Sequence, residues 1–202
     1  MATVKNSPAA LALCAAALTL PLAACSSSTK PTASTTPSIE NVVTSSATSD
    51  GASCPSAAPQ NPAPEWSLAG TSGHVAVTGS TDTTAPNVTV TAPFSVSSTQ
   101  VHTLRAGTGP VVAPTATVSV CYAGYDGRDG HKFDSAYDRG EPASFSLEQV
   151  VPGFQKAIAG QKVGSTVAVA MTAADGYPQG QPSANIQPGD TLVFAIRILA
   201  AQ

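Results

Sequence analysis

Apolar and polar residues alternate in short stretches over the second half of the chain, which predicts β-strands. The clearest stretch is 115–122, where Val118, Val120 and Tyr122 share one face of the strand and Cys121 lies on the other. Further stretches with strand character cover residues 99–104, 145–147, 166–171 and 191–199. Most of the folded chain is therefore expected to be sheet.

One segment has a helical pattern instead. In residues 152–159, Phe154, Ala157 and Ile158 fall on one stripe, and Gly160 suits the C-terminal end of a helix. Many strands and a single short helix predict an α+β domain, in which an antiparallel β-sheet wraps around that helix.

Residues 65–98 carry weaker strand signals. The pieces 74–77 and 88–90 alternate, and the turn residues of 82–87 separate them. We expect an N-terminal extension of one or two edge strands placed ahead of the core domain at 99–202.

The stretch after the clearest strand combines turns with charge. The strand is expected to end at residues 123–124, Ala-Gly, because Asp-Gly pairs follow at 126–127 and 129–130. Asp134 then lies five residues before Arg139, whose planar guanidinium suits a carboxylate partner.

Composition and charge narrow the functional classes. Of 202 residues only 10% are charged, and the net charge is −3. This balance argues against nucleic-acid binding, which requires a basic face. The 17 prolines and 16 glycines, with many Ser, Thr and Ala residues, indicate that part of the chain does not fold.

The first 24 residues resemble a bacterial lipoprotein signal peptide. Lys5 precedes the apolar run 9–22, which has the length of a signal-peptide core and is short for a membrane span. The run leads into Leu-Ala-Ala-Cys at 22–25, which resembles a lipoprotein cleavage box, so Cys25 would be lipidated. The alternative is an ordinary secretory peptide. Either leader predicts export, and the lipid anchor predicts attachment to the outer face of the bacterial cell membrane.

Residues 25–64 form a Ser/Thr/Pro/Ala-rich tract with few residues able to form a core, which predicts a disordered, flexible tether. Cys54 in this tract and Cys121 in the predicted strand leave two alternatives, a disulfide or two free thiols. A metal site is not expected, because no CxxC pair occurs and His74, His102 and His131 are scattered.

An ordered series of motifs covers roughly the last hundred residues. It consists of Tyr122-x-Gly124, Asp129-Gly130-x-x-Phe133-Asp134-Ser135, Val150-Val151-Pro152-Gly153-Phe154, Gly160-x-x-Val163-Gly164, Gly176-Tyr177 and Ile186-x-Pro188-x-x-Thr191-Leu192-Val193-Phe194. In order and spacing this series resembles the FKBP-type peptidyl-prolyl cis-trans isomerases, whose fold is the same α+β arrangement. The resemblance implies a rotamase that acts on proline-containing polypeptides.

Carried over residue by residue, the resemblance implies an apolar pocket. Catalytic residues would be Tyr122, Phe133, Asp134, Tyr177 and Phe194. Substrate-binding residues would be Arg139, Val150, Val151, Phe154 and Ile186. Phe154 would lie under the proline ring, and Asp134 would sit at the rim, hydrogen-bonded to Tyr122 and Arg139.

Several positions depart from the family pattern. Phe154 stands where Trp is commonest, Ala143 where an aromatic residue often lines the rim, and Gln187 where the first of two prolines is usual. The loop at 178–182 also lacks the histidine of eukaryotic members. The family resemblance also implies macrolide inhibitors as candidate ligands. The departures from the family pattern affect the expected catalytic efficiency and the expected affinity for these inhibitors.

The reaction that the resemblance implies needs neither cofactor nor metal, because rotation about an amide bond makes and breaks no covalent bond. A monomer is expected, since no feature of the sequence favours an oligomer. Two other readings remain open at this point: a module that binds proline-containing segments without turning them over, and a purely structural envelope domain.

Overall fold

The computed structural model describes residues 53–60 and 62–202. The predicted signal peptide, Cys25 and most of the predicted tether lie outside the described residues. Within the described part of the chain, no helix is both long enough and apolar enough to cross a membrane.

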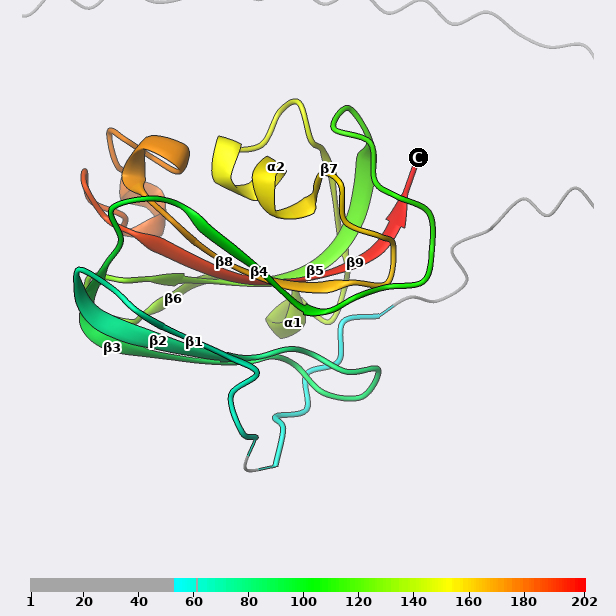
Figure 1. The fold of residues 1–202 in the computed structure, drawn as a ribbon, viewed down its shortest axis with the longest axis horizontal. Helices are drawn as coiled ribbons and strands as arrows, with labels where there is room; N and C mark the ends of the chain where they lie inside the picture. Colours follow the sequence, from blue (N-terminus) through cyan, green and yellow to red (C-terminus); the bar gives the residue numbers. More distant parts are fainter. Residues whose placement is uncertain (1–52, 61) are drawn as a thin grey trace, which may run out of the picture. The chain divides into compact units, whose positions relative to one another are not determined.

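The main sheet is antiparallel and curves around one helix, as the sequence predicts (Figure 1). Its strands follow the order β4-β8-β9-β5-β6, and β7 pairs with β5. Their bounds are β4 Gln100–Arg105, β5 Thr117–Asp126, β6 Lys132–Ser135, β7 Ala143–Ser146, β8 Thr166–Met171 and β9 Leu192–Ala201. The central pair is β5 and β9, whose register runs from Val118 opposite Ala201 to Asp126 opposite Leu192.

The helix inside this curve is α2, Pro152–Ile158, which the sequence predicts to within one residue. Pro152 occupies the start of the helix, where its missing N–H costs nothing. Phe154, Ala157 and Ile158 are buried on its inner side. Gly160 follows with a φ of 81°, a conformation that favours glycine and ends the helix. Two 3₁₀ turns, η1 Ala173–Asp175 and η2 Pro182–Ala184, connect β8 to β9.

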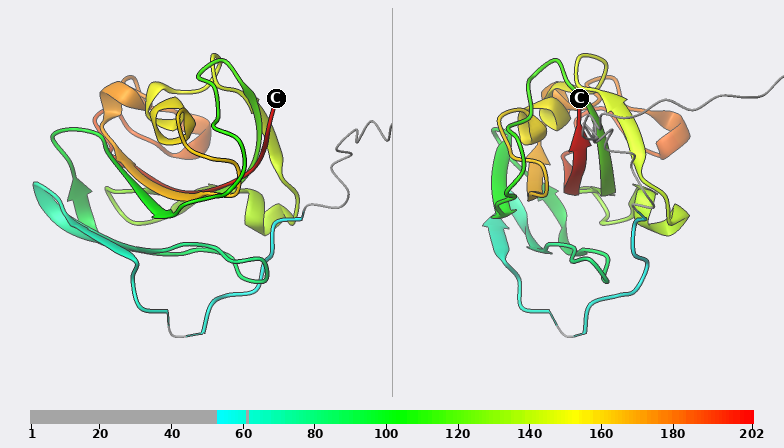
Figure 2. Two further views of the ribbon diagram at one scale, coloured as in Figure 1. Left: turned by 45° about the vertical axis from the view of Figure 1, so that its right-hand side comes forward. Right: turned by 90° about the vertical axis from the view of Figure 1, so that its right-hand side faces the viewer.

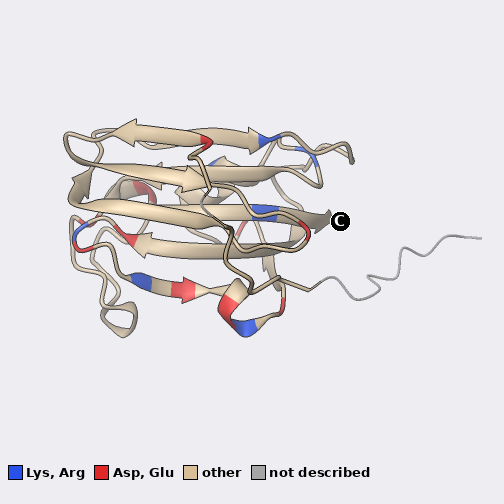
Figure 3. Cartoon of the chain, turned by 90° about the horizontal axis from the view of Figure 1, so that it is seen from below, with Lys and Arg blue, Asp and Glu red and all other residues tan. Residues whose placement is uncertain are grey.

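The N-terminal extension forms a sheet of its own, so the prediction of one or two edge strands is wrong. Strands β1 (Trp66–Ala69), β2 (Ser72–Thr78) and β3 (Asn87–Ser95) pair antiparallel with one another in that order. The three strands contain no Lys, Arg, Asp or Glu, and Figure 3 shows these four residue types elsewhere on the chain, in loops and on strands of the main sheet. The views in Figure 2 show this sheet facing the convex side of the main sheet.

Two hydrophobic cores result from this layering. All six residues of β8 are buried, because its alternate side chains serve different cores. Val167, Val169 and Met171 belong to the core around α2. Ala168 and Ala170 belong to the core that the main sheet shares with the extension. In that second core Val75, Val77, Phe94, Val193 and Ala195 are the other buried members.

Strand β5 continues past the predicted break at 123–124, which corrects that prediction. Gly124 pairs with Asp134 of β6 on one side and with Phe194 of β9 on the other. A Cβ atom at Gly124 would lie 2.7 Å from the rings of both Phe133 and Phe194. The glycine therefore allows two aromatic rings to approach the strand, and it does not mark its end.

A second short helix, α1 at Ala136–Arg139, was not predicted. Ser135 caps its N-terminus, since its side chain accepts a hydrogen bond from the Asp138 N–H. Gly140 ends it with a φ of 75°. Four residues are too few to produce a helical periodicity in the sequence, so only the capping residues signal this helix.

Of the two alternatives for Cys54 and Cys121, the structure has the disulfide, with the two Cα atoms 5.6 Å apart. Cys54 is buried, and nearby the Ala85 N–H donates to the Ala57 carbonyl at 2.8 Å. Residues 53–60, which lie within the predicted tether, are therefore attached to the folded domain.

Candidate active site

A cavity of about 340 Å³ opens beside α2 on the inner side of the main sheet. Its walls come from strands β5, β6, β7 and β9, from the segment that leads into α2, and from the turn after η1. The lining residues are Tyr122, Phe133, Asp134, Phe145, Gln149, Val150, Val151, Phe154, Tyr177 and Phe194. The cavity is predominantly aromatic and aliphatic, with a carboxylate on one wall.

Aromatic rings in edge-to-face contact build the base of the cavity. The ring centroids of Tyr122 and Phe154 lie 5.9 Å apart with planes at 86°. Those of Phe133 and Phe194 lie 5.5 Å apart at 85°, and those of Phe145 and Phe154 lie 5.7 Å apart at 78°. Such contacts hold each ring in one orientation, so the base presents a preformed apolar surface.

Three polar side chains form a closed hydrogen-bonded group on the wall. The Tyr122 hydroxyl donates to Oδ2 of Asp134, and Nη1 of Arg139 donates to Oδ1 of the same carboxylate. Nη2 of Arg139 also donates to the Tyr122 Oη at 3.1 Å. The guanidinium lies 5.7 Å from the centroid of the Tyr122 ring. We call Tyr122, Asp134 and Arg139 the rim triad.

The rim triad shifts the ionisation of its members. Burial, and then the hydrogen bond to the Asp134 carboxylate, raises the pKa of Tyr122 to about 12. Partial burial opposes ionisation of Asp134, but the hydrogen bonds from Tyr122 and Arg139 outweigh it and hold the Asp134 pKa below its ordinary value. At neutral pH the triad therefore contains a phenol, a carboxylate and a guanidinium.

The structure brings most of the predicted site residues to this cavity. Those on its wall are Tyr122, Phe133, Asp134, Val150, Val151, Phe154, Tyr177 and Phe194. Arg139 lies behind the wall and reaches it through Asp134. Ile186 is buried in the core, with only 3% of its surface exposed, and is not among the lining residues, so its predicted role in substrate binding stays a prediction.

Two lining residues were missed. Phe145 alternates with Leu147 in the sequence, which indicated a strand but not which face of β7 meets the cavity. Gln149 lies in the turn before α2 and has no sequence signal of its own. Ala143, the small residue expected at the rim, sits on β7 and is not among the lining residues.

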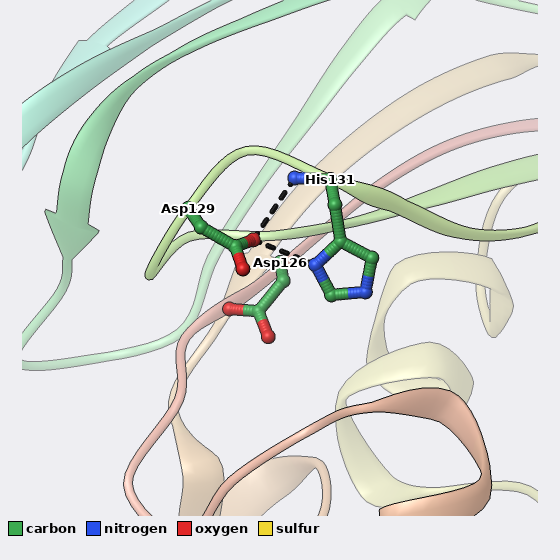
Figure 4. A group of neighbouring side chains, drawn as sticks. All are labelled: Asp126, Asp129 and His131. Carbon is green, nitrogen blue, oxygen red and sulfur yellow. Dashed lines mark hydrogen bonds and ion pairs between the residues drawn. The ribbon is translucent and has the colours of Figure 1, made fainter.

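A second group of ionisable residues lies at the turn between β5 and β6 (Figure 4). Asp126 is fully buried, and Oδ1 of Asp129 lies 2.6 Å from Nδ1 of His131. Arg128 donates to Asp126 at 3.4 Å, to Asp129 at 3.0 Å and to Asp190 at 3.2 Å. Since the guanidinium already supplies the positive charge among these carboxylates, we assign the group to holding the turn against the start of β9.

Comparison with known proteins agrees with this geometry. The family model of the FKBP-type peptidyl-prolyl cis-trans isomerases matches residues 109–199. A probable FK506-binding protein of Corynebacterium glutamicum is 36% identical over 96 residues, which cover 47% of this chain and 80% of that protein. The FKBP-type 22 kDa peptidyl-prolyl cis-trans isomerase of Escherichia coli is 36% identical over 100 residues, which cover 50% of this chain and 48% of that protein.

Among solved structures, FkpA from Escherichia coli is 32% identical with a TM-score of 0.47, and the match covers 52% of this chain and 48% of that one. The Corynebacterium protein is more than 30% identical to this chain, which covers most of its length, and this relationship shows the class of protein. The chain belongs to the FKBP-type peptidyl-prolyl cis-trans isomerases. It spans most of the Corynebacterium protein but less than half of the two Escherichia coli proteins.

Proposed function

We propose that this chain accelerates rotation about X–Pro bonds in polypeptides outside the cytoplasm, with the aromatic cavity as the site of the reaction. The observation that carries the proposal is the apolar base of the cavity bordered by the rim triad. Such a site can accept a proline ring and its preceding amide while it keeps most water away from them.

Desolvation of the amide is the main source of the acceleration. Rotation faces a barrier of roughly 18–20 kcal/mol, because resonance gives the C–N bond double-bond character and places negative charge on the oxygen. Water stabilises that separated charge, so an apolar cavity weakens the resonance and favours the twisted amide. Each reduction of the barrier by about 1.4 kcal/mol gives a tenfold faster reaction.

The walls of the cavity orient the substrate in this proposal. Phe154 supports the proline ring, and Phe133 and Phe194 enclose it from the side of the sheet. The Tyr177 hydroxyl and the backbone N–H of Val151 donate hydrogen bonds to carbonyls of the substrate. Because the three Phe rings are held by the sheet and by α2, and the Val151 N–H by the start of α2, binding does not have to order these groups.

Asp134 contributes electrostatically. A planar amide carries more negative charge on its oxygen than a twisted one. A carboxylate facing that oxygen therefore raises the energy of the planar state more than that of the twisted state, which lowers the barrier. Arg139 and Tyr122 hold the Asp134 carboxylate in place and keep it ionised.

The test is a protease-coupled assay of X–Pro isomerisation with the purified chain, combined with exchange spectroscopy by NMR on a bound proline peptide. We expect rates well above the uncatalysed reaction and exchange between the cis and trans signals. Binding without exchange would contradict catalysis and leave a binding module. Addition of a macrolide inhibitor should compete with the peptide for the same cavity.

The proposed location is the outer face of the bacterial cell membrane, with a lipid on Cys25 and the domain acting as a monomer. The lipobox-like residues 22–25 support the anchor, and the Cys54–Cys121 disulfide fits an oxidising compartment. A relative named outer membrane protein MIP, from Legionella longbeachae, is 35% identical over 103 residues, 51% of this chain and 44% of that protein. Mass spectrometry of the mature protein should find an acylated Cys25, and Cys25→Ser should release the domain from the membrane fraction.

A further inference from the structure

Cys54 makes one disulfide and one backbone hydrogen bond to the folded domain, and each joins it to a residue directly next to the rim triad. Its sulfur is bonded to Cys121, which directly precedes Tyr122 in β5. Its backbone N–H donates to the carbonyl of Gly140 at 3.1 Å, and Gly140 directly follows Arg139 in α1. One residue from outside the sheet thus joins the two elements that carry Tyr122 and Arg139.

Helix α1 depends on such tertiary contacts. A helix of four residues is not stable by itself, because nucleation is unfavourable and few hydrogen bonds follow it. One contact holds the start of α1 through Tyr137, whose buried hydroxyl donates to the Ser80 Oγ at 2.7 Å. The contact from Cys54 holds its end, at the residue next to Arg139.

The segment that carries Cys54 is itself attached along its length. The Ala57 carbonyl accepts from the Ala85 N–H at 2.8 Å, and the Thr78 hydroxyl donates to the Ala63 carbonyl at 3.1 Å. Cys54 is also buried, with 3% of its surface exposed. Residues 53–60 and the extension sheet therefore give Cys54 a defined position from which it can hold α1.

We propose that Cys54 is a positioning residue for the isomerase site: its disulfide to Cys121 and its hydrogen bond to Gly140 set the distance between β5 and α1, so that Arg139 reaches both Asp134 and Tyr122. Cys54 does not touch the cavity and acts only through the rim triad. The consequence for catalysis rests on the proposed function, whereas the consequence for the geometry of the triad does not.

The test compares the full chain with its Cys54→Ala variant, which leaves Cys121 in the core of β5 unchanged. Isomerase activity per folded molecule is expected to fall by roughly tenfold, because small displacements of catalytic groups are costly. Reduction of the natural chain with dithiothreitol should produce the same loss, and reduction of the variant should change nothing further. Equal losses of activity in the variant and in the reduced natural chain would show that the disulfide is responsible.

A second readout follows the triad directly. Tyr122 and Arg139 are the groups that hold the Asp134 pKa below its ordinary value, so this pKa should rise in Cys54→Ala when the Asp134 carboxyl carbon is titrated by NMR. The matched control is Val77→Ala, a truncation in the second core far from the cavity. It should lower stability without changing the activity per folded molecule or the titration of Asp134.

An unchanged Asp134 titration in folded Cys54→Ala and in the reduced natural chain would overturn the proposal. If Cys54→Ala fails to fold, the reduced natural chain, checked by circular dichroism, carries the test alone. If the natural chain shows no isomerase activity, the proposed function fails, and the Asp134 titration still decides whether Cys54 positions the triad.

Discussion

The ring of Phe154 stands edge-on to the ring of Phe194, with centroids 5.5 Å apart and planes at 81°. Phe154 comes from the first turn of α2 and Phe194 from β9, so this contact joins the helix to the centre of the sheet. Both rings line the cavity, and both are also about 95% buried. The base of the site is therefore part of the hydrophobic core.

Replacing Phe154 separates catalysis from stability when it is paired with a matched change in the other core. Phe154→Leu and Phe94→Leu should each destabilise the fold by about 1–2 kcal/mol, the usual range for such core changes. Only Phe154→Leu should reduce isomerase activity, by roughly tenfold or more, because Phe94 packs between the two sheets. Urea denaturation and the isomerase assay measure the two effects, and equal activity loss in both variants would contradict the assignment.

Gly124→Ala tests whether the glycine serves the cavity. Its new Cβ would meet the rings of Phe133 and Phe194 at 2.7 Å, so both of these cavity-lining rings must shift. We expect a loss of activity of roughly tenfold with a destabilisation of about 1–3 kcal/mol from overpacking. Shifted NMR signals of the two rings would accompany it. Full activity in the variant would show that the close approach has no catalytic consequence.

The two tyrosines with strongly raised pKa values should ionise at a higher pH than an ordinary tyrosine. Burial is the main cause in both, and it raises the pKa of Tyr122 and of Tyr137 to about 12. In the unfolded chain these tyrosines ionise near pH 10. Their contribution to the free energy of unfolding is therefore fully present below about pH 10 and declines as the pH rises towards 12. In ultraviolet titrations, Tyr122→Phe and Tyr137→Phe should each lack one of the tyrosines that ionise at high pH in the natural chain. A natural chain whose tyrosines all ionise near pH 10 would contradict this.

Removal of Arg139 should weaken the fold only where Asp134 is ionised. Arg139→Met leaves the Asp134 carboxylate without its cation, at a cost of about 0.5 kcal/mol for a pair this exposed. The folded-state pKa of Asp134 is depressed, so this contribution is present above about pH 4, the ordinary value, and is lost as the pH falls through the folded-state value. Urea midpoints of both proteins should therefore converge in acid. A constant difference at every pH would exclude the ion pair as its origin.

Arg128 should contribute more to stability than Arg139, because its partner Asp126 is fully buried. Arg128→Met leaves the buried Asp126 without its cation, so we expect it to destabilise the fold at neutral pH more than Arg139→Met does. Burial already raises the pKa of Asp126, so the loss should shrink as the pH falls and the carboxyl is protonated. Thermal unfolding across the acid range measures this. Restored stability on adding Ca²⁺ or Mg²⁺ would show that the variant has become a metal site.

The sequence alone determined most of the local elements and most of the cavity. Side-chain parity placed Tyr122 on the face of β5 opposite Cys121, and the helical stripe placed Phe154 on the inner side of α2. These predictions succeed because the direction of a side chain within one element depends only on residue spacing. The ordered motifs then predicted which of these elements meet around one pocket.

Only the tertiary structure decided which strands pair and which surfaces meet. The alternation in residues 74–77 is the same for an edge strand and for a separate sheet, since hydrogen-bond partners leave no mark on periodicity. The same limit applies to Phe145 on the cavity wall and to Ile186 in the core. It also applies to Cys54, because a contact with Cys121 across 67 residues depends on how the whole chain packs.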